Sequence, residues 1–302
     1  MRLLNVRSLA LEEFHGNPPP YAILSHTWEA GEVLFQDLQP SAHRNLTEKK
    51  LGYQKIRMSC NLAREDDIPY IWIDTCCINK ESSAELSEAI NSMFRYYRNS
   101  IVCYAHLFDV RRGSTSSLNF YKCKWFTRGW TLQELLAPSN VIFLDMDWVE
   151  LGTKHSLQDF IAAGTGIPTR ALVDFDGESF SVAQMMSWAS QRRTTREEDQ
   201  AYCLMGIFGV HMPALYGEGA VNAFTRLQLE IIKRSYDQSI FVWSMPVGSS
   251  EPRGLLARSP SEFRASGKIR VADGDTGNSV ASTANEKTFS MTNNGLRINL
   301  PL

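Results

Sequence analysis

The chain has 302 residues, of which 43% are hydrophobic and 21% are charged, and its formal net charge is -2 at pH 7. This composition is typical of a globular protein that is long enough for one large domain or two modest domains. The near-neutral charge argues against nucleic acid and membrane surfaces as partners, and no apolar run approaches the roughly 20 residues needed to span a bilayer.

Residues 20–145 alternate between strand-like and helix-like patterns. Short apolar runs predict four buried strands: Tyr21–Ser25, Tyr70–Asp74, Ile101–His106 and Val141–Leu144. The spacing of apolar residues predicts helices over 48–63, after the capping-box pair Ser82 and Glu85, and over Thr131–Leu136. Strands that alternate with helices predict an α/β fold with a parallel sheet, which binds ligands beyond the carboxyl ends of its strands.

Residues 155–236 have a different character, because no run in them is strand-like. Apolar residues at helical spacing predict amphipathic helices over Ala201–Phe208 and Ala220–Ile231. From Ser239 onward the runs FVW, KIRV, TFSM and LRINL predict short strands. The Gly-, Ser- and Asn-rich stretch 272–285 predicts a mobile loop between them.

These patterns predict three parts. We expect an α/β core over 1–150, a helical subdomain over 151–238 and a small C-terminal β region over 239–302. The chain ends on an apolar, strand-like run, so we expect the natural protein to continue past residue 302.

The cysteines are six in number: Cys60, Cys76, Cys77, Cys103, Cys123 and Cys203. No CxxC pair is present, so we expect no zinc site and no other metal. The N-terminal residues carry arginines and a carboxylate pair within a short apolar run and do not resemble a signal peptide. We therefore expect reduced thiols and a cytoplasmic protein.

Polar and aromatic residues follow the first two predicted strands. Ser25, His26 and Trp28 lie where the first strand ends, and Asp74 ends the second strand just before the pair Cys76–Cys77. A Cys–His hydrolase is one function that these residue types allow. Structural roles for the histidine, the tryptophan and the small cysteines explain the same residues, so both interpretations remain open.

The run RGWTLQELL at 128–136 is the most informative one. A helix that begins at Thr131 has Glu134 in its first turn, where the helix dipole stabilises a negative charge. This favourable position is by itself a sufficient reason for a glutamate at residue 134, without any catalytic role. The chain contains neither G-x-x-x-x-G-K-[ST] nor G-x-G-x-x-G after a strand, which argues against a P-loop nucleotidase and a Rossmann dehydrogenase.

Three sequence blocks stand out when they are taken together: YAILSHTWE at 21–29, YIWIDTCCINKESSAELSEAINSMFRYYRNS at 70–100 and KWFTRGWTLQELLAP at 124–138. They resemble the fungal heterokaryon-incompatibility (HET) domain. The segment RRTTREEDQAYCLMGIFGVHMPALYGEG at 192–219 is similar to the continuation found in these proteins. The resemblance extends in order over roughly residues 5–235.

HET domains in turn resemble Toll/interleukin-receptor (TIR) domains. The TIR pattern of an Ile-Asp strand end, an L-x-x-A-I helix and a W-x-x-x-E-L motif is matched here by Ile73–Asp74, Leu86–Ile90, Trp130, Glu134 and Leu135. Many TIR domains have one residue fewer between the tryptophan and the glutamate, so this chain departs from them at Trp130. The resemblance implies a TIR-like (flavodoxin-like) parallel sheet with flanking helices.

The TIR resemblance also implies an activity, since the matching glutamate of TIR enzymes is catalytic in NAD+ cleavage. It implies an NAD+ glycohydrolase with Glu134 as the catalytic residue, NAD+ as substrate and no cofactor. The residues implied for the substrate pocket are Ser25, His26, Trp28, Asp74, Arg128 and Trp130, with Arg128 or Lys80 as contacts for the phosphates. Neutral nicotinamide leaves without a general acid, so a single carboxylate suffices.

The biological role that this resemblance implies is that of a toxic effector in heterokaryon incompatibility and regulated cell death. We expect a homo-oligomer on activation, with regulatory domains or a partner protein outside this chain. The alternative is a death-signalling module that works through homotypic contacts and has no enzymatic activity.

Overall fold

The computed structural model of the protein describes residues 1–40, 42–113, 120–245, 248, 252–270, 289–292 and 295–298. The chain forms two compact units, Met1–Phe175 and Asp176–Leu302. The boundary that we expected after residue 150 lies inside the first unit, within the strand Glu150–Thr153. That strand belongs to the central sheet, so the sheet extends beyond the expected boundary at residue 150.

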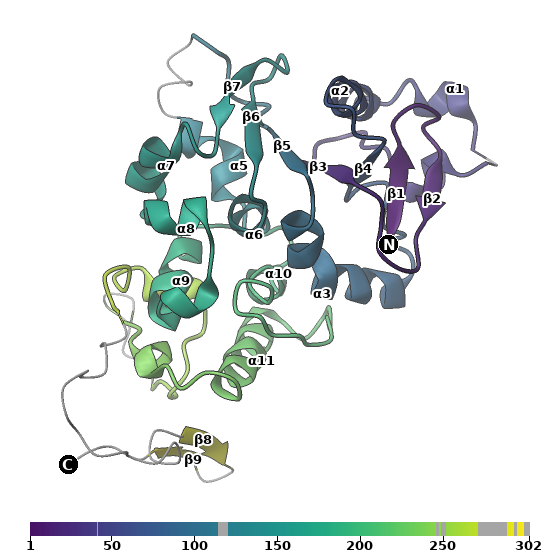
Figure 1. The fold of residues 1–302 in the computed structure, drawn as a ribbon. Helices are drawn as coiled ribbons and strands as arrows, with labels where there is room; N and C mark the ends of the chain where they lie inside the picture. The colour runs from purple at the N-terminus through teal and green to yellow at the C-terminus, as the bar shows by residue number, and fades with distance from the viewer. Residues whose placement is uncertain are drawn as a thin grey trace. The chain divides into compact units, whose positions relative to one another are not determined.

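A seven-stranded sheet forms the centre of the first unit (Figure 1). Its strands are β1 (Arg2–Asn5), β2 (Leu11–Glu13), β3 (Tyr21–His26), β4 (Tyr70–Ile73), β5 (Val102–His106), β6 (Val141–Leu144) and β7 (Glu150–Thr153). Their order is β2-β1-β4-β3-β5-β6-β7. Strands β4, β3, β5 and β6 are parallel, whereas β1, β2 and β7 pair antiparallel.

The α/β class and the four predicted strands are confirmed, since those four form the parallel centre of the sheet. The whole sheet is mixed, because three antiparallel strands that we did not predict flank that parallel centre. These three strands are short, and β2 and β7 have no fully buried residue. Edge strands of this kind lack the long apolar runs that identify a buried parallel strand.

Strand β3 lies at the point where the order of the parallel strands reverses. The chain passes from β3 to β4 on one side and then returns to β5 on the other side of β3. All six residues of β3 are buried, as expected for a parallel strand that is covered on both faces. In doubly wound sheets, ligands bind at the carboxyl ends of the strands beside such a reversal.

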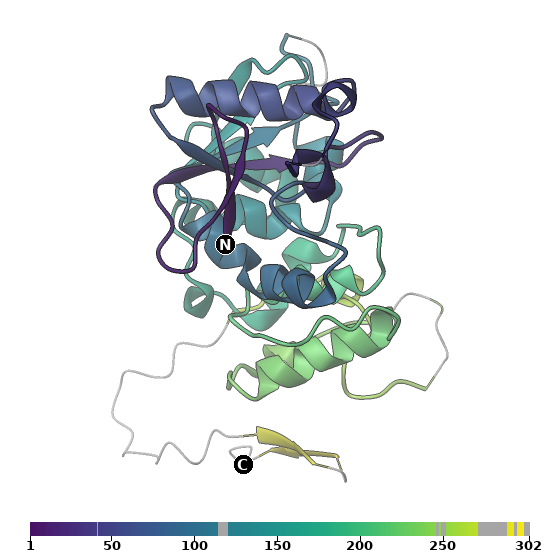
Figure 2. The same ribbon diagram turned by 90° about the vertical axis from the view of Figure 1, so that its right-hand side faces the viewer.

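Helices cover both faces of this sheet. The first unit contains η1 (Phe35–Leu38), α1 (Arg44–Thr47), α2 (Tyr53–Glu65), α3 (Ser83–Arg98), η2 (Phe120–Lys122), α5 (Lys124–Thr127), α6 (Thr131–Leu136), α7 (Gln158–Thr165) and α8 (Thr169–Val173). Helix α2 lies on one face of the sheet and α3 on the other (Figures 1 and 2). Helix α3 also packs against α6. The helices predicted from apolar spacing therefore correspond to α2, α3 and α6.

The second unit is helical in its first part. It contains η3 (Gly177–Ser179), α9 (Val182–Ala189), α10 (Asp199–Tyr202), α11 (Ala220–Ile232), η4 (Gln238–Phe241) and η5 (Pro260–Phe263). Helix α11 confirms the prediction for Ala220–Ile231. The helix predicted over Ala201–Phe208 is wrong beyond Tyr202, because consecutive turns follow α10 up to Gly209, which has a φ of 62°.

Two short strands, β8 (Phe289–Thr292) and β9 (Gly295–Ile298), pair antiparallel and correspond to the runs TFSM and LRINL. The strand predicted for FVW is wrong, since Phe241 ends η4 and neither Val242 nor Trp243 forms a strand. Residues 268–270 of the run KIRV form no strand. Val271 and the loop predicted over 272–285 lie outside the described residues.

The start of α3 forms half of the predicted capping box. Ser82 is the N-cap residue, and its Oγ accepts a hydrogen bond from the backbone N–H of Glu85 at 3.3 Å. The Glu85 carboxylate does not return to the N-cap. It accepts from the N–H of Asn79 at 2.8 Å and pairs with Arg2 of β1 at 2.6 Å. Glu85 therefore ties α3 to strand β1 of the sheet.

Replacement of the cap tests this arrangement. Ser82→Ala removes the acceptor for an N–H in the first turn, and we expect the free energy of unfolding to fall by about 1 kcal/mol in chemical denaturation. Ser82→Asp retains an acceptor and should remain close to the original protein. The control is Ser83→Ala, which changes the exposed neighbouring residue. Equal losses for Ser82→Ala and Ser83→Ala would show that the cap contributes nothing.

Candidate functional site

A buried carboxyl group, that of Glu134, lies next to the carboxyl end of β3. Glu134 belongs to α6 and is only 8% exposed. The Oγ of Ser25 in β3 donates to the Glu134 carboxylate, and the indole Nε1 of Trp125 donates to the same Oγ at 2.7 Å. The hydroxyl of Tyr97 on α3 also interacts with this carboxyl. An indole N–H only donates, so the Trp125 bond leaves the Ser25 hydroxyl proton directed at Glu134.

Helix α6 is held at both of its ends. At its start, the hydroxyl of Thr131 donates to the carbonyl of Trp125 in α5. At its end, the buried ammonium of Lys154 donates to the carbonyls of Leu135 and Pro138. Carbonyls in the last turn of a helix, such as that of Leu135, have no partner inside the helix, and a cation there also complements the helix dipole. The position of Glu134 is therefore fixed by contacts with three other segments of the chain.

The environment of Glu134 favours its neutral form. Burial raises the pKa of the carboxyl from 4.5 to about 8. The hydrogen bond from Ser25 and the positive charge of Arg128 lower this pKa, and the negative charge of Asp74 raises it further. At neutral pH the carboxyl is therefore mostly protonated without a ligand. A cation bound close to it would lower the pKa and favour the carboxylate.

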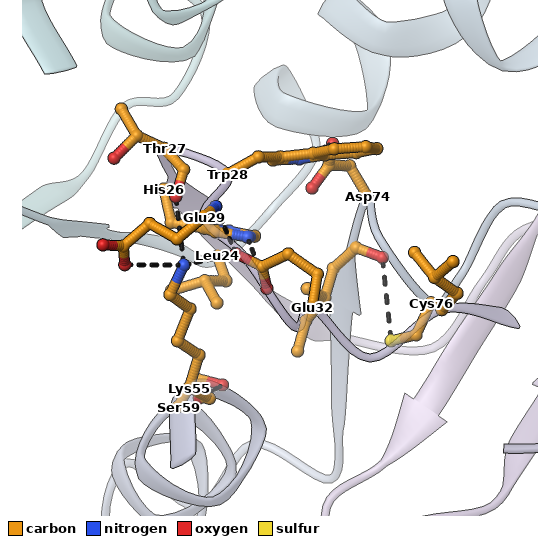
Figure 3. A network of polar contacts seen from close by, with 12 residues as sticks. Leu24, His26, Thr27, Trp28, Glu29, Glu32, Lys55, Ser59, Asp74 and Cys76 are labelled. Atoms are coloured by element: carbon orange, nitrogen blue, oxygen red, sulfur yellow. Dashed lines mark hydrogen bonds and ion pairs between the residues drawn. The ribbon is translucent and has the colours of Figure 1, made fainter. Parts of the chain in front are cut away.

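A second cluster lies where β4 ends. The Nε1 of Trp28 donates to Oδ2 of Asp74 at 2.8 Å, and the two side chains lie side by side in Figure 3. The Nζ of Lys80 lies 3.3 Å from the centroid of the Trp28 ring and 3.7 Å from the same carboxylate oxygen. Trp28 is 41% exposed, so part of its aromatic surface is open to solvent.

A buried ion-pair network holds the loop that follows β3 (Figure 3). Lys55 of α2 pairs with Glu32 and, at 3.2 Å, with Glu29, and it donates to the carbonyl of Thr27 at 3.0 Å. Nε2 of His26 lies 3.7 Å from the Glu32 carboxylate. Burial by itself would raise the pKa of Glu32, but His26, Lys55 and the N–H of Glu29 lower it to about 2.

The six residues predicted for the substrate pocket divide among these clusters. Ser25 contacts Glu134, and Trp28 contacts Asp74. Arg128 affects Glu134 through its charge, and Trp130 is the N-cap residue of α6. His26 instead faces Glu32, and none of the described contacts joins it to Glu134.

Sequence reasoning missed the contributions of Trp125, Tyr97 and Lys55. Tyr97 ends the apolar stripe of α3, so its spacing indicates only that it is buried. Lys55 lies on the buried side of α2, where a lysine breaks the apolar pattern. A charged residue at a predicted core position is the signal that would have identified Lys55.

The two adjacent cysteines do not have the surroundings of nucleophiles. Cys76 and Cys77 are 0% and 3% exposed, and their sulfur atoms contact the backbone of Ile73. The contact with Cys77, together with burial, raises the pKa of the Cys76 thiol well above its ordinary value. A catalytic thiol needs a lowered pKa and access to substrate, so these surroundings argue against the Cys–His hydrolase.

The fold and these clusters define an α/β domain with polar and ionisable groups at the carboxyl ends of its parallel strands. Residues 21–118 match the family "Heterokaryon incompatibility protein (HET)", and residues 222–254 match a domain of unknown function, DUF8212. The chain contains a HET domain. Over 227 residues it is 48% identical to vegetative incompatibility protein HET-E-1 of Podospora anserina. This alignment covers 72% of the chain but only 16% of HET-E-1.

No solved structure matches this chain significantly. Within the described parts of the chain, no helix is both long and apolar enough to cross a membrane. No group of three or more His, Cys, Asp or Glu side chains in those same parts could hold a metal ion.

The raised pKa of Glu134 predicts a pH-dependent effect on stability. The folded carboxyl keeps its proton up to about pH 8, whereas the unfolded one ionises near 4.5, so unfolding releases a proton between these values. Glu134 therefore destabilises the fold progressively as pH rises through this window, by at most about 1.4 kcal/mol per pH unit. Glu134→Gln cannot ionise, so we expect its stability advantage over the original protein to grow from pH 5 to pH 8.

Thermal unfolding at several pH values measures this difference. Glu65→Gln, on the exposed surface of α2, is the matched control and should show no growing advantage. A constant difference between Glu134→Gln and the original protein at all pH values would contradict a raised pKa in the folded state.

Proposed function

We propose that this HET domain acts in heterokaryon incompatibility by cleaving the nicotinamide–ribose bond of NAD+, with Glu134 as the catalytic residue. The observation that carries the proposal is the buried carboxyl of Glu134, held by the Ser25 hydroxyl beside the strand reversal of the sheet. Doubly wound sheets bind ligands at this position, and a buried carboxyl with a shifted pKa is typical of a catalytic group. The relative is named as a vegetative incompatibility protein.

Cleavage of the nicotinamide–ribose bond requires one carboxylate close to the ribose. The bond between the ribose C1′ and the pyridinium nitrogen breaks, and its electron pair moves to that nitrogen, so nicotinamide leaves as a neutral molecule. The ribosyl group becomes an oxocarbenium-like cation, which a carboxylate stabilises by charge and by hydrogen bonds to the ribose hydroxyls. Water then attacks C1′ and releases a proton, which gives ADP-ribose. Neither step needs a metal, a cofactor or a second acid.

The surroundings of Glu134 suit this chemistry. In the absence of substrate, burial raises the pKa of the Glu134 carboxyl to about 8. The pyridinium cation of NAD+ would lower this pKa and so favour the carboxylate when substrate is bound. The Ser25 hydroxyl holds one carboxylate oxygen in place. Trp28 offers an aromatic surface for the nicotinamide ring, and Arg128 supplies a positive charge for the phosphates.

We extend the proposal to the biological setting. The chain would be the toxic effector part of a longer protein, would act on cytoplasmic NAD+ and would become active when copies associate. The small share of HET-E-1 that the chain covers supports other parts as the source of this control. Depletion of NAD+ would then cause regulated cell death.

The activity test compares Glu134→Gln with Glu65→Gln in the 302-residue protein. The two substitutions change the same functional group, but only Glu134 is buried beside Ser25. We expect Glu134→Gln to lower nicotinamide release from NAD+ by at least about 100-fold and Glu65→Gln to leave it unchanged. The assay uses concentrated protein and artificially dimerised protein, since association is the proposed trigger.

Two results would contradict the proposal. Full turnover by Glu134→Gln would exclude Glu134 as the catalytic residue. Toxicity of Glu134→Gln in cells, with the fold intact, would instead favour the signalling module that works through homotypic contacts without catalysis.

The pH profile gives an independent prediction. Because the carboxylate is the active form, kcat/KM should rise with pH and level off above an apparent pKa near 8. Ser25→Ala removes a hydrogen bond that lowers this pKa, so the rising limb should move to higher pH. Steady-state kinetics between pH 6 and pH 10 measures the rising limb of kcat/KM for the original protein and for Ser25→Ala. A profile that is flat over this range would show that Glu134 does not titrate in the reaction.

A further inference from the structure

Trp28 and Asp74 together have the composition of a cation-binding site. The hydrogen bond from Trp28 Nε1 to Asp74 Oδ2, at 2.8 Å, fixes an aromatic ring against a carboxylate (Figure 3). Aromatic faces attract cations through the ring quadrupole, and a carboxylate attracts them through its charge. The loop that carries Trp28 is itself held by the Lys55 network, so the ring is prepositioned.

The ammonium group of Lys80 occupies this site. Its Nζ lies 3.3 Å from the centroid of the Trp28 ring and 3.7 Å from Asp74 Oδ2. That nitrogen is shielded from solvent, yet no group in the described structure accepts a hydrogen bond from it. Burial also lowers the pKa of Lys80. The ammonium is thus held by the face of the Trp28 ring and by the Asp74 carboxylate, the same two groups that a competing cation would use.

We propose that Trp28 and Asp74 form a binding site for a planar organic cation of the pyridinium type, and that Lys80 is a built-in competitor which leaves when the cation binds. The inference deepens the proposed function, because it assigns the site for the cationic nicotinamide end of NAD+. Asp74 lies close enough to Glu134 to raise its pKa. A pyridinium ring on Trp28 would therefore lie within electrostatic range of the catalytic carboxyl.

The opposite role for Lys80 is that of a phosphate ligand. Its unused N–H donors would suit a phosphate, but the carboxylate of Asp74 beside it would repel one. The two roles predict opposite effects. Removal of a competitor strengthens binding of the cation, whereas removal of a phosphate ligand weakens binding of the substrate.

The test measures binding of 1-methylnicotinamide, a pyridinium cation without phosphates, by calorimetry on the 302-residue protein. We expect Lys80→Ala to bind this cation about two- to thirtyfold more tightly than the original protein, the range of one cation–π contact. Lys80→Met, which keeps most of the stem without the charge, should show a smaller gain. The double variants Lys80→Ala/Trp28→Leu and Lys80→Ala/Asp74→Asn should lose the gain.

Lys49→Ala removes an exposed lysine from the same unit and controls for net charge, so its affinity should not change. Neutral nicotinamide is the ligand control and should not distinguish the variants. Unchanged or weaker binding of 1-methylnicotinamide by both Lys80 variants, with the fold intact, would overturn the inference. Weaker binding of inorganic pyrophosphate by Lys80→Ala would make Lys80 a phosphate ligand instead and would also overturn it.

These outcomes are separate from those of the proposed function, because the binding test needs no turnover. If NAD+ cleavage is observed, Lys80→Ala should in addition lower KM with little change in kcat. Cleavage that depends on Glu134, together with no effect of Lys80 on cation binding, would retain the proposed function and reject only the cation site.

Discussion

The hydrogen bond from Ser25 to Glu134 is the contact on which the candidate site depends. A carboxyl group at 8% exposure needs a donor, and an isolated buried charge would be far less stable than a neutral acid. Ser25 provides the donor from a fully buried strand, and Trp125 directs its proton. The two ends of α6, held by Thr131 and Lys154, keep the carboxyl within reach of that donor.

Two buried carboxyl groups beside β3 show how the environment decides the state of an acid. Glu32 is paired with the ammonium of Lys55, and its pKa is lowered to about 2. Glu134 receives hydrogen bonds from neutral hydroxyl groups, and burial raises its pKa to about 8. One group is therefore a permanent anion that holds a loop, whereas the other can change its charge near neutral pH. Only the second has the property that proton-dependent or charge-stabilising catalysis uses.

The loop after β3 connects the Lys55 ion-pair network with the Trp28–Asp74 cluster. It is attached to α2 by Lys55 and carries Trp28 to Asp74 at the end of β4. An aromatic surface with a carboxylate thus lies at one strand end and the catalytic candidate Glu134 beside the neighbouring strand. This arrangement needs no glycine-rich phosphate loop, which agrees with the absence of such a motif from the sequence. The aromatic ring with its carboxylate and the buried acid therefore lie beside neighbouring strands of one sheet.

The sequence by itself determined the α/β class, the four parallel strands and the helices α2, α3, α6 and α11, because buried segments have strong periodic patterns. It did not reveal the antiparallel strands at the edges, whose residues are only partly buried. Among the pocket residues it indicated Ser25 and Glu134, yet their contact joins positions 109 residues apart. The tertiary structure alone decided that contact, the orientation of His26 toward Glu32 and the position of Lys80 on Trp28. The physical reason is that local spacing records which side of a strand or helix is buried, whereas hydrogen bonds and pKa values depend on which distant groups that burial brings together.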